Sequence, residues 1–291
     1  MSETRTSLSE DLPRTSSNTS RRRRKRYSAL RSIALGAIIV FFAVPIVWMV
    51  LAAFKQNIDV VDSSKTIFFT PTLNNFVKVF TQEDFGLFIW NSLFVAVVAT
   101  GISLVIALPA AFAMARFLMP KSAASILLAR VVPGISLLVP WYFIFSNLGL
   151  IQGYGALLLS HMFIALPLIL WILMAFFEGL PEELEEAGQM DGLTAIGAFV
   201  RIALPLSRPG IATATILAFI FSWNNFLFSL VLSDSSTGTL PVAIFNFIGF
   251  AGVDWGSLMA ASVVVTAPVM VVALFAQKHI VSGLTAGATK G

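Results

Sequence analysis

The chain has 291 residues, of which 57% are hydrophobic and only 12% charged, and its mean hydropathy is +0.86. An ordinary soluble domain carries about 25% charged residues, so the composition excludes that class. The formal net charge of +4 comes mostly from the basic N-terminal segment and does not indicate nucleic-acid binding. With no cysteine and two histidines, His161 and His279, the chain forms no disulfide, and a metal site is not expected.

Residues 1–32 are rich in Ser, Thr and Arg and nearly free of apolar side chains, a composition that predicts a disordered cytoplasmic tail. The run Arg21–Arg26 is interpreted as a topology anchor against anionic lipid head groups. The apolar stretch that follows exceeds the about 7–15 residues of a signal-peptide core. The sequence therefore favours an uncleaved first span over a secretory signal.

Six apolar windows are long enough to cross a bilayer, which takes about 20 mostly apolar residues per helix. Because a backbone in lipid has to satisfy its own hydrogen bonds, these windows are expected to be helices. The spans are predicted at Ile33–Phe54, Phe88–Ala115, Ala123–Phe145, Ala156–Phe177, Ile211–Leu232 and Leu258–Ala276. The sequence thus predicts an all-α membrane protein, with a six-helix domain at 33–280 and a cytoplasmic C-terminal tail at 281–291.

Lysine and arginine predict the orientation, because they accumulate in cytoplasmic loops. With both termini cytoplasmic, only Lys55, Lys65 and Lys78 lie outside, and Arg130 lies within a span. The other fifteen lie inside: Arg5, Arg14, Arg21, Arg22, Arg23, Arg24, Lys25, Arg26, Arg31, Arg116, Lys121, Arg201, Arg208, Lys278 and Lys290. Both ends, and the loop between the fourth and fifth spans, are therefore predicted to be cytoplasmic.

The chain contains no recognisable source of energy for transport. All 15 acidic residues lie outside the predicted spans, whereas ion-coupled carriers usually need an ionisable group at membrane depth. The pairs Lys65-Thr66 and Lys121-Ser122 lack the glycines of a phosphate-binding loop. Active transport is therefore expected to need a partner. An ion-coupled secondary carrier and a non-transporting membrane scaffold remain the alternatives.

A polar segment between the fourth and fifth spans predicts a helix–turn–helix. Pro181 suits a first helical position, and the carboxylates at 182, 183, 185 and 186 complement the positive end of the helix dipole. Gly192 is predicted to stop this helix in the left-handed conformation. Thr194 is expected to cap a second short helix that Pro205 ends.

The first of these helices has an apolar stripe at three-residue spacing, formed by Leu184, Ala187 and Met190. A structured polar segment between two membrane spans is a place where a protein outside the bilayer can act on the spans. We therefore interpret Glu186–Pro205 as a docking site for a motor subunit.

Glu186–Pro205 resembles the cytoplasmic signature of permeases in binding-protein-dependent ABC importers: Glu-Ala-Ala, three residues, Gly, nine residues, Ile, one residue, Leu-Pro. The one departure is Gly188, where the family usually has alanine, and glycine there costs about 1 kcal/mol of helix stability. The residues that the resemblance assigns to ATPase coupling are Glu186, Ala187, Gly188, Asp191, Gly192, Ile202, Leu204 and Pro205.

Further likeness to the carbohydrate branch lies in Asn91-Ser92, Arg116-Phe117, Ser222–Phe226 and Gly283–Gly287, and the whole resemblance covers about residues 30–291. More narrowly, the chain is similar to the shorter, second permease of maltose-type importers. The resemblance implies a non-enzymatic subunit of the bacterial inner membrane that forms half of a sugar pathway. It also implies a second, non-identical permease, an extracytoplasmic solute-binding protein, and two cytoplasmic ATPase subunits that bind ATP and Mg, with no cofactor in this chain.

The candidate pathway residues are Ser222, Trp223, Asn224 and Asn225, placed in the middle of the predicted fifth span. Asparagine amides can exchange hydrogen bonds with hydroxyl groups, and an indole can stack on the apolar face of a sugar. The alternative is that these polar groups join helices, as polar groups in membranes commonly do. The sequence leaves a monosaccharide, disaccharide, polyol or glycerophosphodiester as possible solutes.

Other single residues have simpler interpretations. Arg130, about two turns into the third span, is expected to extend to the interface rather than serve the pathway. His161 is expected to be a hydrogen-bonded packing residue. Trp255 is interpreted as an interfacial anchor, and Pro241–Phe250 as a short helix dipping towards the membrane. Kinks are predicted at Pro45, Pro109, Pro133, Pro140, Pro167 and Pro268.

Overall fold

The computed structural model describes residues 17–82, 84–117, 119, 124–126, 128, 131–151, 153–249 and 252–286. Side chains are described from residue 31 to residue 275 within these ranges, residue 82 excepted. Arg130, predicted to extend to the interface, lies outside the described residues. The chain divides into two compact units, Met1–Leu51 and Ala52–Gly291, and each is described by itself.

The described residues of the first unit belong to the helix α1, Ser17–Ala53, whose last two residues lie in the second unit. Its segment Arg31–Ala53 has a mean hydropathy of 2.7 and is long enough to cross a membrane, as predicted for the first span. α1 already begins at Ser17, within the segment that the composition assigns to the tail, and residues 1–16 lie outside the described part of the chain.

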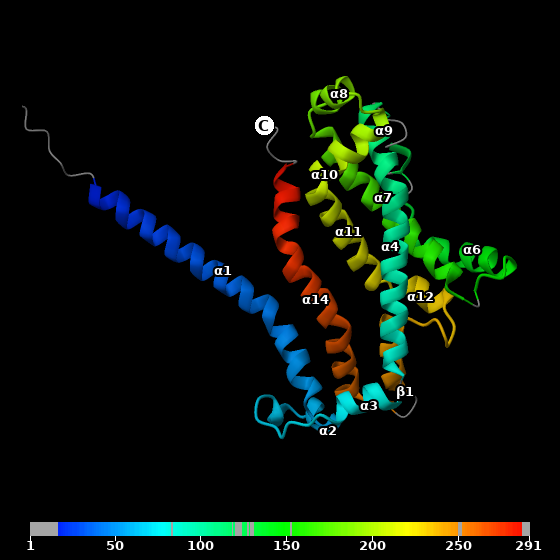
Figure 1. The fold of residues 1–291 in the computed structure, drawn as a ribbon. Helices are drawn as coiled ribbons and strands as arrows, with labels where there is room; N and C mark the ends of the chain where they lie inside the picture. Colours follow the sequence, from blue (N-terminus) through cyan, green and yellow to red (C-terminus); the bar gives the residue numbers. More distant parts are fainter. Residues whose placement is uncertain are drawn as a thin grey trace, which may run out of the picture. The chain divides into compact units, whose positions relative to one another are not determined.

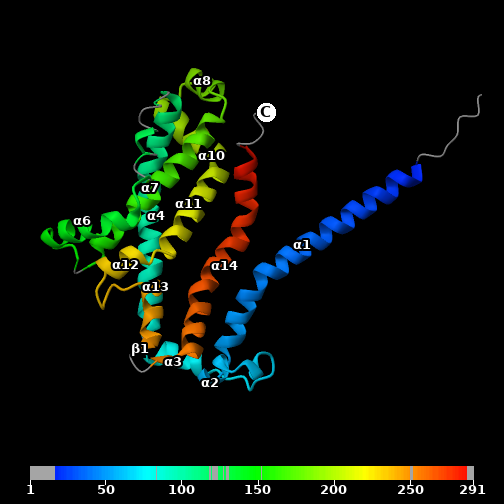
Figure 2. The ribbon, with the colours of Figure 1, turned by 180° about the vertical axis from the view of Figure 1, so that it is seen from behind.

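The second unit is a helical bundle with short elements at its ends (Figures 1 and 2). Its first half comprises α2 (Asn57–Val61), the 3-10 turn η1 (Ser63–Lys65), α3 (Asn74–Gln82), α4 (Phe85–Arg116), α6 (Gly134–Asn147) and α7 (Tyr154–Glu178). Its second half begins with α8 (Glu183–Met190), α9 (Ala195–Ala198), the π-helical turn η2 (Phe199–Ala203), α10 (Leu204–Leu206), α11 (Arg208–Trp223) and α12 (Leu227–Leu232). It continues with α13 (Leu240–Ala243) and the 3-10 turn η3 (Ile244–Phe247). The two-stranded antiparallel hairpin of β1 (Ile248–Gly249) and β2 (Gly252–Val253) follows, and the last element is α14 (Trp255–Ala286).

The centre of the bundle is the pair α4 and α7, which run side by side in the same direction. At one end Tyr154 Oη donates to Asn91 Oδ1 at 2.6 Å, and at the other Arg116 Nη1 donates to the Phe177 carbonyl at 2.8 Å. Buried alanines along α4 let the backbones approach closely, as small residues do between membrane helices. α11 packs against both helices, and α14 packs against α11.

Two predicted spans are not continuous helices in the described part of the chain. The third, Ala123–Phe145, leaves helical conformation at Val132 and Pro133, and α6 begins at Gly134 with Pro133 as its extended N-cap. Proline disfavours helical geometry in the residue before it, which explains the break. The fifth, Ile211–Leu232, is interrupted between Trp223 and Leu227.

By length and composition, four described helices can cross a membrane: Arg31–Ala53, Phe85–Arg116, Tyr154–Glu178 and Trp255–Phe275. A fifth arises if the segment Ala195–Leu206 and α11, bent by 73° with respect to each other, form one broken span. α6, with 14 residues, is apolar but shorter than a span. Among the described residues the fold is thus an all-helical membrane fold apart from the β1–β2 hairpin, and the count of six spans stays a prediction.

Gly210 in α11 sits directly against α7. A Cβ added there would lie 2.8 Å from Cδ1 of Phe176, closer than real side chains approach. We expect Gly210→Ala to lower the stability of the bundle by about 1–3 kcal/mol, the usual cost of overpacking. The measurement is the thermal unfolding midpoint in detergent.

Gly101→Ala in α4 is the matched control, because nothing lies within 4 Å of a Cβ at that position. Alanine there removes a helical glycine, so the midpoint is expected to stay or rise. Equal midpoints for the two variants would contradict the close packing of α11 on α7.

Candidate functional site

The polar segment after α7 forms the predicted helix–turn–helix at one end of the bundle (Figure 1). α8 ends at Met190, and Gly192 adopts a left-handed φ of +92°, as expected for a glycine stop. The Thr194 side chain caps α9 by accepting a hydrogen bond from Gly197 N at 3.1 Å, also as predicted. The local signals for the turn and for the second helix are therefore confirmed.

The two prolines act differently from the prediction. Pro181 lies two residues before the first helical residue, Glu183, rather than at the first position of α8. Pro205 does not end the second helix, since α10 continues to Leu206 and the chain bends only at Ser207. The π-helical turn η2 precedes Pro205, and in it Leu204 N bonds to the Phe199 carbonyl. This wider turn accommodates a residue that cannot donate a backbone hydrogen bond.

Arg116, the last residue of α4, holds α8 in place. Its Nη2 lies 2.6 Å from Glu185 Oε1, and its Nε lies 3.1 Å from both Glu185 oxygens. The same guanidinium donates to the carbonyls of Phe177 at 2.8 Å and Leu180 at 3.3 Å, where α7 ends. The two side chains are only 11% and 10% exposed, so this is a buried, bidentate ion pair. One cation therefore joins the ends of α4, α7 and α8.

The sequence does not predict this ion pair between Arg116 and Glu185. Arg116 appears there in the lysine and arginine distribution and in the Arg116-Phe117 likeness, and Glu185 as one carboxylate of an acidic helix start. The available signal was weak: a single basic residue ends the second span, and several carboxylates begin α8. Which carboxylate turns inward depends on how α8 packs, and the sequence does not state that.

The inward face of α8 is formed by Glu185 and Gly188, which are buried. A Cβ at position 188 would collide with Cδ1 of Ile202 and lie 3.2 Å from Cδ1 of Leu193. The departure from alanine at Gly188 therefore coincides with a close approach between α8 and η2.

The outward face of α8 carries the predicted apolar stripe, Leu184, Ala187 and Met190, and all three side chains are exposed. Met190 is 89% exposed. Glu186, Asp191 and Gly192 are exposed beside it, whereas Ile202, Leu204 and Pro205 are half-buried. The predicted coupling residues in α8 and the following turn are therefore exposed, apart from Gly188, whereas those in η2 and α10 are half-buried.

The four candidate pathway residues do not lie in the middle of a helix, as predicted, but at the break between α11 and α12. Ser222 and Trp223 are buried. Ser222 Oγ lies 2.7 Å from Nδ1 of His161 on α7, and Trp223 Nε1 donates at 3.1 Å to the Val265 carbonyl, in the turn of α14 before Pro268. These two residues therefore join helices, in line with the alternative interpretation, and His161 is a hydrogen-bonded packing residue as expected.

Asn224 and Asn225 create the break and remain accessible. Asn224 Nδ2 donates to the Ile220 carbonyl at 2.9 Å, and Asn225 Oδ1 accepts from Phe228 N at 3.1 Å, which caps α12. Asparagine side chains compete with the helical backbone in this way, and this explains why α11 stops. Asn224 is exposed and Asn225 half-buried, so only these two of the four offer amide groups to a ligand.

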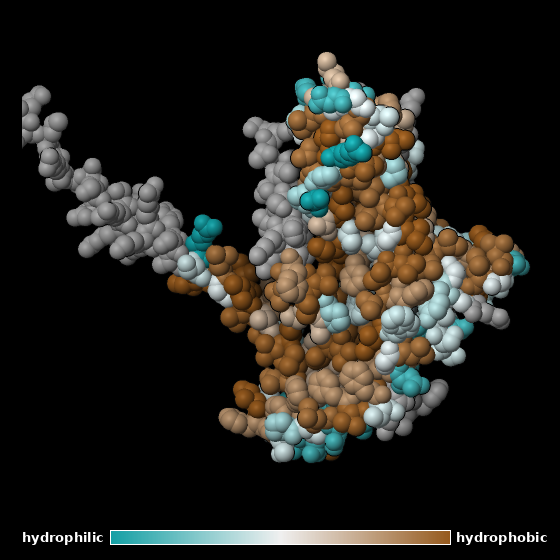
Figure 3. Space-filling model, in the orientation of Figure 1, coloured by the Kyte–Doolittle hydropathy of each residue, from teal (hydrophilic) through white to brown (hydrophobic). Residues whose placement is uncertain are grey.

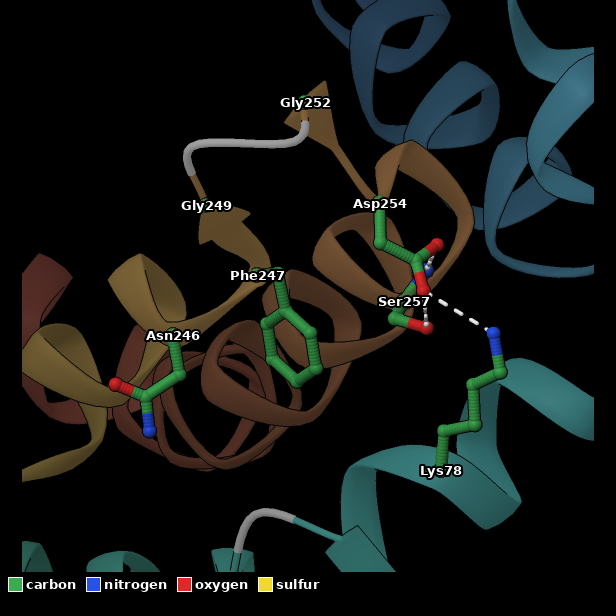
Figure 4. Close-up of a pocket in the computed structure, with 7 residues that line it drawn as sticks. All are labelled: Lys78, Asn246, Phe247, Gly249, Gly252, Asp254 and Ser257. Atoms are coloured by element: carbon green, nitrogen blue, oxygen red, sulfur yellow. Dashed lines mark hydrogen bonds and ion pairs between the residues drawn. The ribbon is translucent and has the colours of Figure 1, made fainter.

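At the opposite end from α8, a polar cavity of about 230 Å³ opens beneath the hairpin (Figure 4). Its lining residues are Lys78, Asn246, Phe247, Gly249, Gly252, Asp254 and Ser257. Burial raises the pKa of Asp254, but hydrogen bonds from Ser257 and Lys78 outweigh it, and the pKa lies below its usual value. Lys78 Nζ reaches Asp254 Oδ2 at 3.2 Å, which ties α3 to the start of α14.

The predicted short helix in this region is present as α13 and η3, which end at Phe247, and β1 follows at Ile248–Gly249; Phe250 lies outside the described residues. Trp255 begins α14 and is exposed. Within the described part of the chain, no three His, Asp or Glu side chains come together as metal ligands.

Comparison with known proteins decides the family. The family model described as the inner membrane component of binding-protein-dependent transport systems matches residues 103–286, which include the α8–α10 segment and the α11–α12 break. The chain belongs to this family. It is a permease, the membrane subunit of an ABC importer, and ATP hydrolysis takes place on separate subunits.

Named relatives cover nearly the whole permease. The sulfoquinovosyl glycerol transport system permease protein of Agrobacterium fabrum is 36% identical over 90% of this chain and 94% of the relative. The trehalose transport system permease protein of Mycobacterium tuberculosis is 38% identical over 88% and 96%. A bacterial ABC transporter that imports the acidic polysaccharide alginate has the same fold, with a TM-score of 0.73 at 21% identity over 92% of this chain and 99% of that chain.

The ion pair between Arg116 and Glu185 predicts how α8 responds to the loss of one charge. Breaking a buried ion pair on one side costs about 3–5 kcal/mol, because the other charge is left buried and unpaired. We expect Glu185→Gln to loosen α8 while the bundle stays folded. Hydrogen exchange of residues 183–206 in the purified permease measures this, and the protection is expected to fall by about a hundredfold or more, since each 1.4 kcal/mol is about a factor of ten.

Glu183→Gln is the matched control, because Glu183 is exposed in the first turn of the same helix and lies about 160° around the helix from Glu185, away from the inward face. Its exchange pattern is expected to match the unmodified chain. Unchanged protection in Glu185→Gln would show that the ion pair does not hold α8.

Proposed function

We propose that this permease forms half of the translocation pathway of an importer for a sugar or sugar-like solute, and that Glu186–Pro205 couples it to an ATPase. The observation that carries the proposal is the exposed apolar face of α8, outside the span-length helices and held rigidly by a buried ion pair. Exposed apolar surface of this kind marks protein interaction sites. The sugar class is supported by the names of the relatives, which include trehalose and sulfoquinovosyl glycerol permeases.

The mechanism that this geometry supports is mechanical. A partner that moves α8 acts through Arg116 on the ends of α4 and α7, and through α9, η2 and α10 on α11, which begins after the 73° bend. Closure of two ATPase subunits on ATP would in this way rock the helices between inward- and outward-facing states. Rigid attachment matters, because a flexible loop would absorb the displacement.

The proposed topology has six spans with both termini and α8 in the cytoplasm, a basic tail at 1–32, the membrane domain at 33–280 and a tail at 281–291. It follows the lysine and arginine distribution and agrees with α8 and the α3 end lying at opposite ends of the bundle (Figure 1). The proposed partners are two ATPase subunits, a second non-identical permease and an extracytoplasmic solute-binding protein. ATP and Mg would be bound by the ATPases.

We place solute contact at Asn224 and Asn225, at the break between α11 and α12. Helices broken inside a membrane expose backbone and side-chain hydrogen-bonding groups, and transporters build their sites from such breaks. The structure gives Asn224 Oδ1 and Asn225 Nδ2 no protein partner among the described residues, so both are available to hydroxyl groups. Ser222 and Trp223 are assigned to holding the break in place.

The experiment that tests the assembly is purification of the tagged permease in mild detergent, with co-purifying subunits identified by mass spectrometry. Recovery of an ATPase, a second permease and a binding protein is the expected result. A folded chain that purifies alone would favour an ion-coupled carrier or a scaffold.

Gly192→Pro tests the coupling segment. Proline cannot adopt a φ of +92° and removes the hydrogen bond from Gly192 N to the Gln189 carbonyl. We expect normal membrane insertion, ATPase activity no longer stimulated by loaded binding protein, and uptake reduced at least tenfold. Uptake at the unmodified rate would contradict the docking model.

Asn224→Leu tests the pathway by removing an exposed amide whose side chain, among the described residues, bonds to the Ile220 carbonyl of its own helix. The expected outcome is a severalfold change in the solute concentration for half-maximal uptake. Asn225→Asp serves as a companion because a carboxylate oxygen retains the cap on Phe228 N while it removes the amide donor. Unchanged kinetics in both variants would remove the break from the pathway.

A further inference from the structure

The short helix α3 divides into three sectors around its axis. The first sector faces the bundle and contains Asn75 and Val79, which are buried. The Asn75 amide donates to the carbonyls of Ala53 and Lys55 at 2.8 and 2.7 Å, so α3 holds the chain at Ala53–Lys55, where α1 ends. α3 also packs against α14.

The second sector is polar and consists of Asn74, Lys78 and Thr81. Lys78 is engaged by Asp254 at the start of α14, and Asn74 and Thr81 are exposed. At about 100° per residue these three side chains fall within about 60° of one another, on a side of the helix different from the buried sector.

The third sector is apolar and exposed. Leu73 immediately precedes the helix, and with Val77 and Phe80 it forms a stripe at spacings of four and three residues. These side chains are 64%, 55% and 50% exposed. By the same rotation per residue they also fall within about 60°, between the buried and polar sectors. A helix that served only to pack on the bundle would not need this second apolar stripe.

The position of α3 indicates what covers the stripe. α3 ends at Gln82, three residues before the span-length helix α4 begins, and α14 begins at Trp255. The indoles of Trp90 and Trp255 are exposed near these helix starts, and exposed tryptophans mark the interface between lipid and water. Hydrophobic surface continues from the long helices to this end of the bundle, where hydrophilic residues appear (Figure 3). The stripe therefore continues the lipid-facing surface at the depth of the head groups.

We propose that α3 is an interfacial helix whose Leu73, Val77 and Phe80 insert into the lipid at the membrane face opposite α8. Helices with one apolar and one polar side lie in the interface in this way. Ile67 and Phe68 in the preceding loop are also exposed apolar side chains. Through Asn75 and Lys78, a lipid-anchored α3 holds the residues after α1 and the start of α14 at a fixed depth. The inference depends on the membrane location alone and is independent of solute and coupling.

The test uses the absence of cysteine from the chain, so that one introduced cysteine is the single labelling site in the permease, which is labelled before it is assembled with its partners. Val77→Cys carries a nitroxide label, and the assembled importer is placed in lipid nanodiscs. Power-saturation electron paramagnetic resonance then compares collisions with oxygen, which partitions into lipid, and with a water-soluble nickel chelate. We expect accessibility to oxygen severalfold above that to the chelate, as at the reference position Val105→Cys on the exposed side of α4.

Thr81→Cys is the matched control on the polar sector, where the chelate is expected to exceed oxygen. An excess of the chelate at position 77 would place the stripe in water, and low accessibility to both reagents would place a protein subunit over it. Either result overturns the proposal. Leu73→Cys repeats the measurement on the same stripe if the label at position 77 prevents assembly.

Discussion

The buried ion pair between Arg116 and Glu185 is the constraint on which the α8 end of the permease depends. A charge withdrawn from water has to be paired and hydrogen-bonded, and Arg116 meets this requirement with Glu185 and with two carbonyls at the end of α7. The geometry of the guanidinium fixes the direction of each bond. The apolar face of α8 is held outward as a consequence, because Glu185 and Gly188 occupy the inward side.

At the α11–α12 break, too, some residues fix the helices to each other and others remain accessible to a ligand. Ser222 and Trp223 satisfy their polar atoms against His161 and the Val265 carbonyl, so they fix the end of α11 to α7 and α14. Trp223 also supplies a donor near Pro268, where a proline disturbs the backbone bonding of α14. Asn224 and Asn225 then turn the chain and keep amide groups available. A rigid break of this kind can present polar groups without exposing a whole helix.

The two ends of the bundle meet different surroundings. At the α8 end the exposed apolar side chains lie beyond the span-length helices, in a segment rich in carboxylates, and we assign them to a protein partner. At the α3 end they lie beside the starts of α4 and α14 and close to exposed tryptophans, and we assign them to lipid. Exposed apolar area thus indicates a protein partner at one end of the bundle and lipid at the other, according to its depth relative to the spans.

Local sequence patterns were enough to predict the membrane class, four of the spans, the Gly192 stop and the Thr194 cap, because each depends on local composition or on residues a few positions apart. The fold was needed to show that Glu185 is the carboxylate paired with Arg116, since that pairing joins residues 69 positions apart. It also decided that Ser222 and Trp223 are buried while Asn224 is exposed, and that Pro205 lies within a continuing helix. These outcomes depend on which face of each helix meets its neighbour, and helical periodicity in a uniformly apolar span leaves that face undefined.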